Sequence, residues 1–396
     1  MKIVHVIGYF VPELGYQEYY LAKKHAQMGH EVYVITSDML YPFPNIEGML
    51  KEAGAKETSR KRTPGFSTID DIKVYRLRHF FEYSDFILLK GIGRILEKIK
   101  PDVVFAHESR QSPPAFAAYY KKKFGYKLIV DQHDFYHEIP NHVWWKKLLR
   151  FLDYFIFRRF IINYSLAKAD RIIAVTDESR NFLVKTHHVP QSIITVVPLG
   201  VDTGAFRFSN KARTSIRKKL NIKKGDVVLV FSGTIVRRKG IEILFSALSE
   251  IRNKNAKLLI VGSGDSHYMS ELKNMAGKLK IINRVIFAGF VNKNKVMDYF
   301  SASDIGVWPG NNSVSIIEAM ACGLPIVMAD MQLSHLVDYG NGVKFPQYNV
   351  KKLREALEKL INDKKSRSEM SAKSLRAVTE NYSYDLIAKK FLELAR

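Results

Sequence analysis

The segment 304–329 combines residues suited to holding a phosphorylated ligand. A short apolar run at 304–308 leads into turn-forming residues, and a helical composition at 314–321 then ends at a glycine and a proline. Free N–H groups would therefore stand at a helix N-terminus just beyond a strand, where the helix dipole favours an anion such as a phosphate. The residues that present these groups are Ser313, Val314 and Ser315.

Glu318 lies one turn into the same predicted helix. Its carboxylate is placed to accept hydrogen bonds from the vicinal hydroxyls of a ribose. The spacing of Ser315 and Glu318 also fits a capping box, in which the acid only satisfies the start of the helix. The segment by itself leaves both interpretations open.

A cluster of cations follows another predicted strand, 227–232, in the order Arg237, Arg238, Lys239, Gly240. Lys239 can neutralise a diphosphate as a point charge, and Arg238 can add a second donor. A run of charges is usually a solvated surface. This one stands between a strand and a helix, which favours a binding role.

Glycines and histidines after other predicted strands complete the candidate site. Gly15 follows the first strand and could bring backbone amides against a diphosphate, while Gly262 and Val291 could line a base and ribose. His133 follows the strand 127–131 and could bond a sugar hydroxyl or a phosphate. His107 follows the preceding strand, so the two histidines could converge; both could equally be structural.

Short β-rich runs alternate with helical stretches through both halves of the chain, which predicts parallel sheets covered on both faces. We expect an α/β protein of two Rossmann-like domains, residues 1–197 and 198–383, and a final helix at 384–396. A polar loop is expected at 45–69 and a helix at 87–99. The strands are expected at 2–8, 31–36, 74–78, 102–106, 127–131, 171–175, 227–232, 257–261, 284–288, 305–307 and 325–328.

The formal charge of +23 favours an anionic partner: nucleic acid, lipid headgroups or a phosphorylated substrate. Nucleic acid is disfavoured because the basic stretches contain no recognition module. The single cysteine, Cys322, excludes an internal disulfide and a zinc thiolate cluster. No metal-binding motif or phosphate loop is present, so no metal is expected. The start has no signal-peptide pattern and no run is long enough to span a membrane, which predicts a cytoplasmic protein.

The segment 144–162 mixes aromatic and aliphatic residues with lysines and arginines. At helical spacing its apolar side chains gather on one face, as in a helix that lies at a membrane surface. A core helix with a basic outer face has the same pattern. The protein could therefore be peripheral on the inner face of a membrane, attracted by anionic lipid.

Taken together, these motifs resemble those of the family 4 glycosyltransferases, nearly from end to end of the chain. The resemblance rests on the Gly15 loop with the run 29–32, on the His133–Asp134 pair, on 169–175 and 198–202, on Lys239–Gly240 and on 318–325. It implies a GT-B fold with a cleft between the domains, a C-terminal helix crossing back to the first domain, and retention of anomeric configuration. It also implies that Lys239 and Gly15 bind the donor phosphates, Glu318 the ribose and His133 the transferred sugar.

Three positions depart from the family pattern. Gly310 stands where the family commonly has the first of two glutamates, Tyr16 replaces a frequent glycine, and Thr234 stands where an arginine often follows a glycine. Arg237 or Arg238 could supply the missing cation. The lost carboxylate leaves the donor sugar unspecified.

The sequence hypothesis is a retaining glycosyltransferase that moves a hexose from a nucleoside diphosphate sugar to a glycan or lipid-linked acceptor, with no further cofactor. A noncatalytic nucleotide-sugar binding or assembly protein is the alternative.

Overall fold

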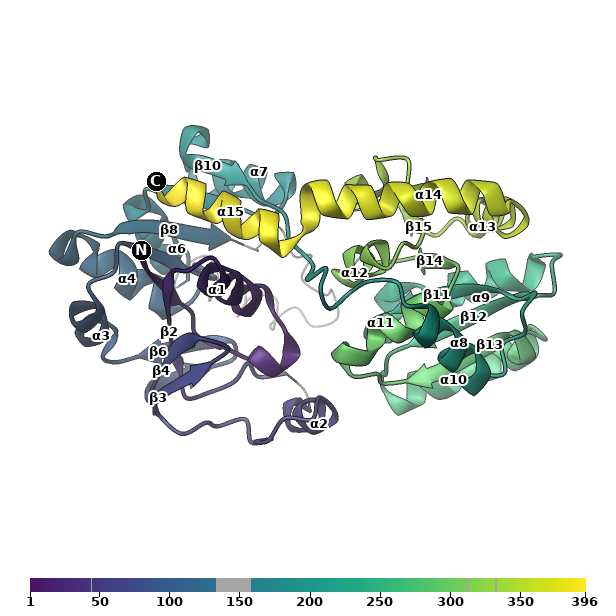
Figure 1. Cartoon of the computed structure of the whole chain (residues 1–396), viewed down its shortest axis with the longest axis horizontal. Coiled ribbons are helices and arrows are strands. Elements are labelled where there is room, and N and C mark those ends of the chain that lie inside the picture. Colours follow the sequence, from purple (N-terminus) through teal and green to yellow (C-terminus); the bar gives the residue numbers. More distant parts are fainter. Residues whose placement is uncertain (44, 133–157, 312, 332) are drawn as a thin grey trace, which may run out of the picture. The chain divides into compact units, whose positions relative to one another are not determined.

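The computed structural model describes residues 1–43, 45–132, 158–311, 313–331 and 333–396, which form two compact units (Figure 1). The first unit contains Met1–Leu199 together with Tyr384–Arg396, and the second contains Gly200–Ser383. The boundary expected after residue 197 compares with an observed end of the first unit at Leu199. No helix in the described ranges is long and apolar enough to cross a membrane.

The first unit is built on an eight-stranded sheet in the order β10-β9-β8-β7-β1-β2-β4-β3. Neighbouring strands are parallel except for β3, which pairs antiparallel with β4 at the edge. Their continuous apolar runs suit a sheet buried on both faces. The strands are β1 (Lys2–Val6), β2 (Glu31–Ser37), β3 (Gly65–Ile69), β4 (Ile72–Leu77), β7 (Val103–Ala106), β8 (Lys127–Gln132), β9 (Arg171–Ala174) and β10 (Ile194–Val196).

Two hydrophobic clusters cover the faces of this sheet. One contains α3 (Ile92–Ile99), α4 (Ser112–Phe124), α6 (Arg159–Lys168) and α7 (Asp177–His187). The other contains α1 (Gln17–Gln27) and α15 (Tyr384–Ala395), which pack against each other (Figure 1). The C-terminal helix therefore belongs to the core of the first unit, although the whole second unit separates it from the rest of that unit in the sequence.

Two expectations about local structure are wrong. The expected helix 87–99 begins only at Ile92, because residues Phe86–Leu89 form β6 and pair with β5 (His79–Tyr83) as a hairpin. Gly91, at a φ of 98°, separates the strand from the helix. The expected loop 45–69 contains a helix, α2 (Ile46–Glu52), which buries two apolar residues, and the edge strand β3.

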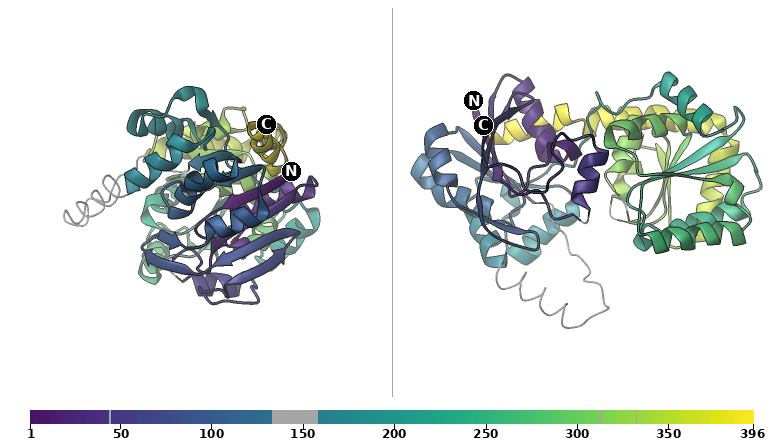
Figure 2. Two further views of the ribbon diagram at one scale, coloured as in Figure 1. Left: turned by 90° about the vertical axis from the view of Figure 1, so that its left-hand side faces the viewer. Right: turned by 90° about the horizontal axis from the view of Figure 1, so that it is seen from below.

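The second unit is an all-parallel six-stranded sheet in the order β13-β12-β11-β14-β15-β16, with helices on both sides (Figure 2). Two Rossmann-like sheets are thus confirmed. The strands are β11 (Val227–Ser232), β12 (Ala256–Val261), β13 (Val285–Gly289), β14 (Ile305–Trp308), β15 (Ile326–Ala329) and β16 (Gly342–Phe345). The helices are α8 (Asn210–Lys219), α9 (Ile241–Glu250), α10 (Ser266–Lys278), α11 (Lys293–Ala302), α12 (Ser315–Ala321), α13 (Val350–Asn362) and α14 (Lys364–Ala377).

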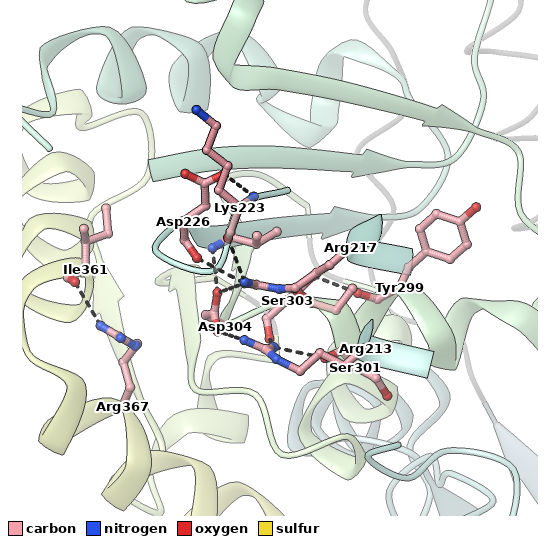
Figure 3. Close-up of polar contacts among 12 residues, drawn as sticks. Arg213, Arg217, Lys223, Asp226, Tyr299, Ser301, Ser303, Asp304, Ile361 and Arg367 are labelled. Atoms are coloured by element: carbon pink, nitrogen blue, oxygen red, sulfur yellow. Dashed lines mark hydrogen bonds and ion pairs between the residues drawn. The ribbon is translucent and has the colours of Figure 1, made fainter. Parts of the chain in front are cut away.

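Two arginines of the basic helix α8 anchor it to the sheet (Figure 3). Arg213 and Arg217 each bond one carboxylate oxygen of Asp304 at 2.7 Å, and the Val228 N–H bonds the same carboxylate at 2.8 Å. Part of the basic charge at 207–224 therefore serves the fold. The other basic residues of the stretch, Arg207, Lys211, Lys218, Lys219, Lys223 and Lys224, are exposed.

Candidate functional site

The order of strands in the second unit reverses between β11 and β14, and open parallel sheets bind ligands at such a point, beyond the carboxyl ends of the strands. The loop after β11 carries Lys239, and the loop after β14 carries Asn311. Lys239 is buried, and its ammonium donates to the Asn311 carbonyl at 2.7 Å. The Asn311 N–H in turn donates to the Arg238 carbonyl at 2.9 Å, so the two loops are held together.

Lys239 is a perturbed cation. Burial, and after it the charge of Arg238, lower the pKa of Lys239 to about 8. A lysine in such a place is poorly solvated and gains more than a surface lysine would from an arriving phosphate. Perturbed groups of this kind gather at functional sites.

Gly310 lies where these two loops touch. A Cβ built on Gly310 would stand 2.4 Å from the Arg238 carbonyl oxygen and 2.6 Å from the Lys239 carbonyl carbon. Both atoms are backbone, so no side chain fits without moving the loop that carries Lys239. A carboxylate side chain at position 310 would therefore not fit as the loops stand.

The start of α12 lies beside the end of β11. The Ser315 hydroxyl donates to the Ser232 carbonyl at 2.9 Å and lies 2.5 Å from the Ser313 hydroxyl. Val314 is the N-cap and gives the helix no side-chain cap. The capping box proposed for Ser315 and Glu318 is not formed, because the serine hydroxyl is used by the strand and the acid points elsewhere.

Glu318 pairs with Lys293 at the start of α11, with a distance of 3.1 Å between Nζ and Oε1. The carboxylate is largely buried. Val291 lies two residues before that lysine, in the loop after β13, where the Asn292 side chain caps the helix by accepting from the Asn294 N–H. Val291 thus lies in the loop that leads to the lysine paired with Glu318.

Gly262 lies in the loop after β12, at a φ of 141°. A Cβ built there would lie 1.9 Å from the Gly233 carbonyl oxygen, so the loops after β11 and β12 meet backbone to backbone. Gly233 in turn lies near Ser313, because its own added Cβ would stand 3.9 Å from the serine hydroxyl. Glycine permits this close approach of the two loop backbones.

The two arginines before Lys239 differ in their surroundings. The Arg237 guanidinium binds Glu271 at 2.5 Å, approaches Glu242 at 3.9 Å and lies over the Tyr268 ring. Arg238 is exposed. Of the two cations suggested as substitutes for the arginine absent at Thr234, Arg237 is already engaged by acidic residues, and Arg238 is the better placed.

In the first unit, Gly15 adopts a left-handed conformation with a φ of 63° and ends a short 3-10 turn just before α1. His133 lies outside the described residues, as does the segment 144–157 of the expected surface helix. His107 is buried, and its ring nitrogens bond Asp131 and His5 rather than facing an open site. The hydrogen-bond chain through His5 and His25 is not anticipated by the sequence; its only sign is a polar residue inside the first apolar strand.

Other chemistry finds no support in the described part of the chain. Cys322 is buried, and burial raises the pKa of its thiol, so it is not a reactive thiolate. No group of three or more histidine, cysteine, aspartate or glutamate side chains there could hold a metal ion. The cluster formed in the second unit is cationic and rich in backbone donors, which suits an anionic, hydroxylated ligand.

Two family models match this chain. A model described as "Glycosyltransferase Family 4" matches residues 17–205, and one described as "Glycosyl transferases group 1" matches residues 212–376. A D-inositol 3-phosphate glycosyltransferase of Xylanimonas cellulosilytica is 27% identical over 240 residues, which is 58% of this chain and only 57% of the relative.

Other similarities extend over the whole chain. The GPI3 subunit of phosphatidylinositol N-acetylglucosaminyltransferase from Saccharomyces cerevisiae is 23% identical over 99% of this chain and 82% of the relative. The crystal structure of HepE from Anabaena, solved in complex with UDP, matches with a TM-score of 0.72 and 17% identity over 99% of both chains. The fold is therefore that of the GT-B glycosyltransferases.

Proposed function

Because this chain belongs to the group 1 and family 4 glycosyltransferases, we propose that it transfers a hexose from a nucleoside diphosphate sugar to an acceptor hydroxyl and retains the anomeric configuration. The observation that carries the proposal is the buried, perturbed cation Lys239 at the point of strand reversal, held against the loop after β14. HepE, which shares the fold, was crystallised with UDP.

The donor would lie along the loops of the second unit. Lys239 and Arg238 would meet the diphosphate, helped by the N–H groups at Ser313, Val314 and Ser315. Glu318 would accept the ribose hydroxyls, while Gly262 and Val291 would border the nucleoside. Gly15 and His133 remain candidates for phosphate and sugar contacts on the family resemblance alone.

The chemistry requires stabilisation of the leaving diphosphate. Charge accumulates on the phosphate oxygens as the glycosidic bond breaks, and a fixed cation in a poorly solvated position stabilises that charge well. In the front-face course that the family suggests, the leaving phosphate oxygen accepts the proton of the acceptor hydroxyl. No step then requires a protein nucleophile, a metal or another cofactor.

The proposed acceptor is a glycan or a lipid-linked molecule. Two similar proteins are named for D-inositol 3-phosphate and for phosphatidylinositol. Both molecules carry hydroxyls, which supports a hydroxylated acceptor for this chain, and the second is a lipid, which supports a lipid-linked one. The charge of +23 would favour an anionic membrane surface. We accordingly propose a cytoplasmic protein that is peripheral on the inner face of the membrane and has no nucleic-acid partner.

A donor screen tests the proposal. UDP-, GDP- and ADP-sugars would be incubated with extracted lipid-linked acceptors, and both released nucleoside diphosphate and the anomeric configuration of the product would be measured. Lys239→Ala should reduce transfer about 10²- to 10³-fold, the usual effect of losing one donor to a developing anion. Lys254→Ala, which removes a charge from a loop of the same unit, is the control. Unchanged transfer in Lys239→Ala would overturn the role of Lys239.

A noncatalytic nucleotide-sugar binding protein is the second candidate. The specific observation in its favour is Gly310, where close backbone packing leaves no room for a carboxylate. Tight donor binding without release of nucleoside diphosphate, over the full panel of donors and acceptors, would favour this candidate over the transferase.

A further inference from the structure

Three histidines in the core of the first unit form one continuous hydrogen-bonded chain. His5 lies on β1, His25 on α1 and His107 just after β7, and all three are buried, with exposed fractions of 0%, 0% and 2%. His5 Nδ1 lies 2.8 Å from His107 Nε2, and His5 Nε2 lies 3.2 Å from His25 Nδ1. Each ring of the chain thus contacts the next through nitrogen.

Both ends of the chain are anchored on acceptors. His25 Nε2 lies 3.1 Å from the carbonyl oxygen of Ala388, in the C-terminal helix α15. His107 Nδ1 lies 2.6 Å from Asp131 Oδ2, near the carboxyl end of β8. The other oxygen of that carboxylate accepts from the Glu108 N–H at 3.1 Å. Asp131 precedes His133 by two residues in the sequence.

The carbonyl end fixes the direction of the chain. A carbonyl oxygen only accepts, so His25 Nε2 must donate to it. Burial lowers the pKa of His25 to about 4 and that of His5 well below its ordinary value, so both rings are neutral near pH 7 and carry one proton each. His25 Nδ1 therefore accepts from His5 Nε2, and His5 Nδ1 accepts from His107 Nε2.

A count of the protons that the chain requires then gives the protonation of the last pair, His107 and Asp131. The four hydrogen bonds from Asp131 to Ala388 require four protons, and three neutral imidazoles supply only three. All four contacts are hydrogen bonds only if a fourth proton lies between His107 Nδ1 and the Asp131 carboxylate. Without it, two acceptors would face each other at 2.6 Å in a buried site, at a high cost in free energy.

We propose that Asp131, His107, His5 and His25 form a one-directional relay that stores one proton at its Asp131 end and positions the carboxyl end of β8 relative to the docked C-terminal helix α15. His107, His5 and His25 are positioning residues in this proposal, since they act through Asp131 and Ala388. The part of the proposal that concerns transfer rests on the proposed function.

Packing leaves the rings little freedom. The planes of the His5 and His107 rings are nearly parallel, with an interplanar angle of 3° and ring centroids 5.1 Å apart. The ring centroid of Phe105 lies 5.3 Å from that of His5 and 5.4 Å from that of Phe391 in α15. The same aromatic cluster therefore extends to the C-terminal helix. A change of tautomer in one ring cannot be absorbed by rotation and must reverse or break the neighbouring bonds.

Ring nitrogen NMR of the whole protein, labelled with ¹⁵N-histidine, tests the proton order directly. At pH 7 His5 and His25 should each appear as the neutral tautomer protonated at Nε2, and His107 should show protons at Nε2 and at Nδ1. Signals would be assigned with single glutamine variants of the three residues. A proton on Nδ1 of His5 or His25 would overturn the relay.

Asp131→Asn is the matched variant. Its amide can donate to His107 Nδ1 while its oxygen still accepts from the Glu108 N–H, so all four links survive with three neutral rings. We expect the His107 Nδ1 proton to vanish, while His5 and His25 keep their tautomers and hydrogen exchange at residues 384–395 stays as slow as in the parent protein. Loss of the order in His5 and His25 would contradict the proposal.

Two variants of His25 test the other end of the relay, where it meets helix α15. His25→Leu removes the donor to Ala388, whereas His25→Gln keeps an N–H donor and an oxygen acceptor. Exchange at 384–395 should accelerate at least tenfold in the leucine variant and be largely restored in the glutamine variant. Equal exchange in the two variants would show that the ring fills space only.

Transfer is measured last, on the same proteins. A positioning role predicts that His25→Leu lowers kcat with little change in donor KM, and that His25→Gln recovers it; equal kcat in both variants would refute the positioning role in transfer. The NMR and exchange results do not depend on any substrate. If the proposed function is wrong, the NMR and exchange results still test the relay; if the relay proposal is wrong, transfer by the parent protein still tests the proposed function.

Discussion

Lys239 combines two properties that a surface lysine lacks: it is buried, and its position is fixed by the Asn311 carbonyl. Its pKa of about 8 means that a modest rise in pH removes the charge from the free protein. A bound diphosphate favours the charged form. The proposed donor binding would therefore be linked to protonation of Lys239.

The proposed role of Lys239 predicts that the affinity for the nucleoside diphosphate identified in the donor screen falls as the pH rises above about 8. Below this pKa the ammonium is largely charged, while above it each pH unit removes about nine-tenths of the remaining charged fraction, so the Kd should rise up to about tenfold per unit. Lys239→Arg, which stays charged, should bind less tightly at pH 7 but with a flat profile to pH 9. Titration calorimetry from pH 7 to 9 measures both, and parallel profiles would contradict the linkage.

A second prediction concerns Gly310, where the important property is the absence of a side chain. Gly310→Ala should cost about 1–3 kcal/mol in the free energy of unfolding, because its Cβ must displace the backbone at Arg238 and Lys239. Donor affinity should fall with it. Gly277→Ala, in α10 with nothing within 4 Å of the new Cβ, is the control and should be neutral or slightly stabilising. Urea unfolding and UDP binding measure the two effects; equal behaviour would refute the packing argument.

At the scale of elements, the position of helix α8 depends on one acidic residue, Asp304. Asp304 receives Arg213, Arg217 and a backbone N–H, and its side chain is 16% exposed. This clip ties the first helix of the second unit to the residue that precedes β14, at the amino end of that strand (Figure 3).

Asp304→Asn should therefore lower the free energy of unfolding of the second unit by about 1–3 kcal/mol. The loss is smaller than for a fully buried ion pair because the Arg213 side chain is partly exposed to solvent. Two guanidinium groups would lose their counter-charge. The control is Glu380→Gln, whose partner Arg376 is 77% exposed, and its effect should be close to zero. Thermal unfolding compares the two variants, and equal shifts would contradict the structural role of the clip.

At the scale of the whole molecule, the last helix completes the core of the unit in which the chain began. Tyr384, Ile387, Ala388, Phe391 and Leu392 of α15 are buried in that cluster. The first unit therefore cannot form its complete core until the entire second unit has been synthesised.

Phe391→Ala should destabilise the first unit by about 3–5 kcal/mol, through lost burial and the cavity left beside Phe105. Glu393→Ala, an exposed position of the same helix, should have little effect. Hydrogen exchange read separately for residues 1–132 and 200–311 distinguishes the units. Faster exchange is expected only in the first; a uniform change would show that the helix does not act on one unit alone.

Local pattern was sufficient for most of the fold. Alternating apolar strands and helices, with glycines at the strand ends, predict two Rossmann-like sheets, because the side-chain period and the turn residues are properties of short segments. The same pattern predicts that the loops with Lys239 and Gly262, and the start of the helix with Glu318, follow the carboxyl ends of strands. It failed where a short apolar run such as Phe86–Leu89 suits either a strand or a helix, and only its pairing with β5 decides.

The sequence by itself determined which chemical groups this protein offers and at which strand ends they stand. The tertiary structure alone decided that Gly310 touches the backbone of Lys239, that Glu318 meets Lys293, and that His5, His25, His107 and Asp131 join through hydrogen bonds to Ala388. The reason is distance along the chain. Contacts between residues up to 363 positions apart depend on how strands are ordered and helices docked, and no local period encodes that order.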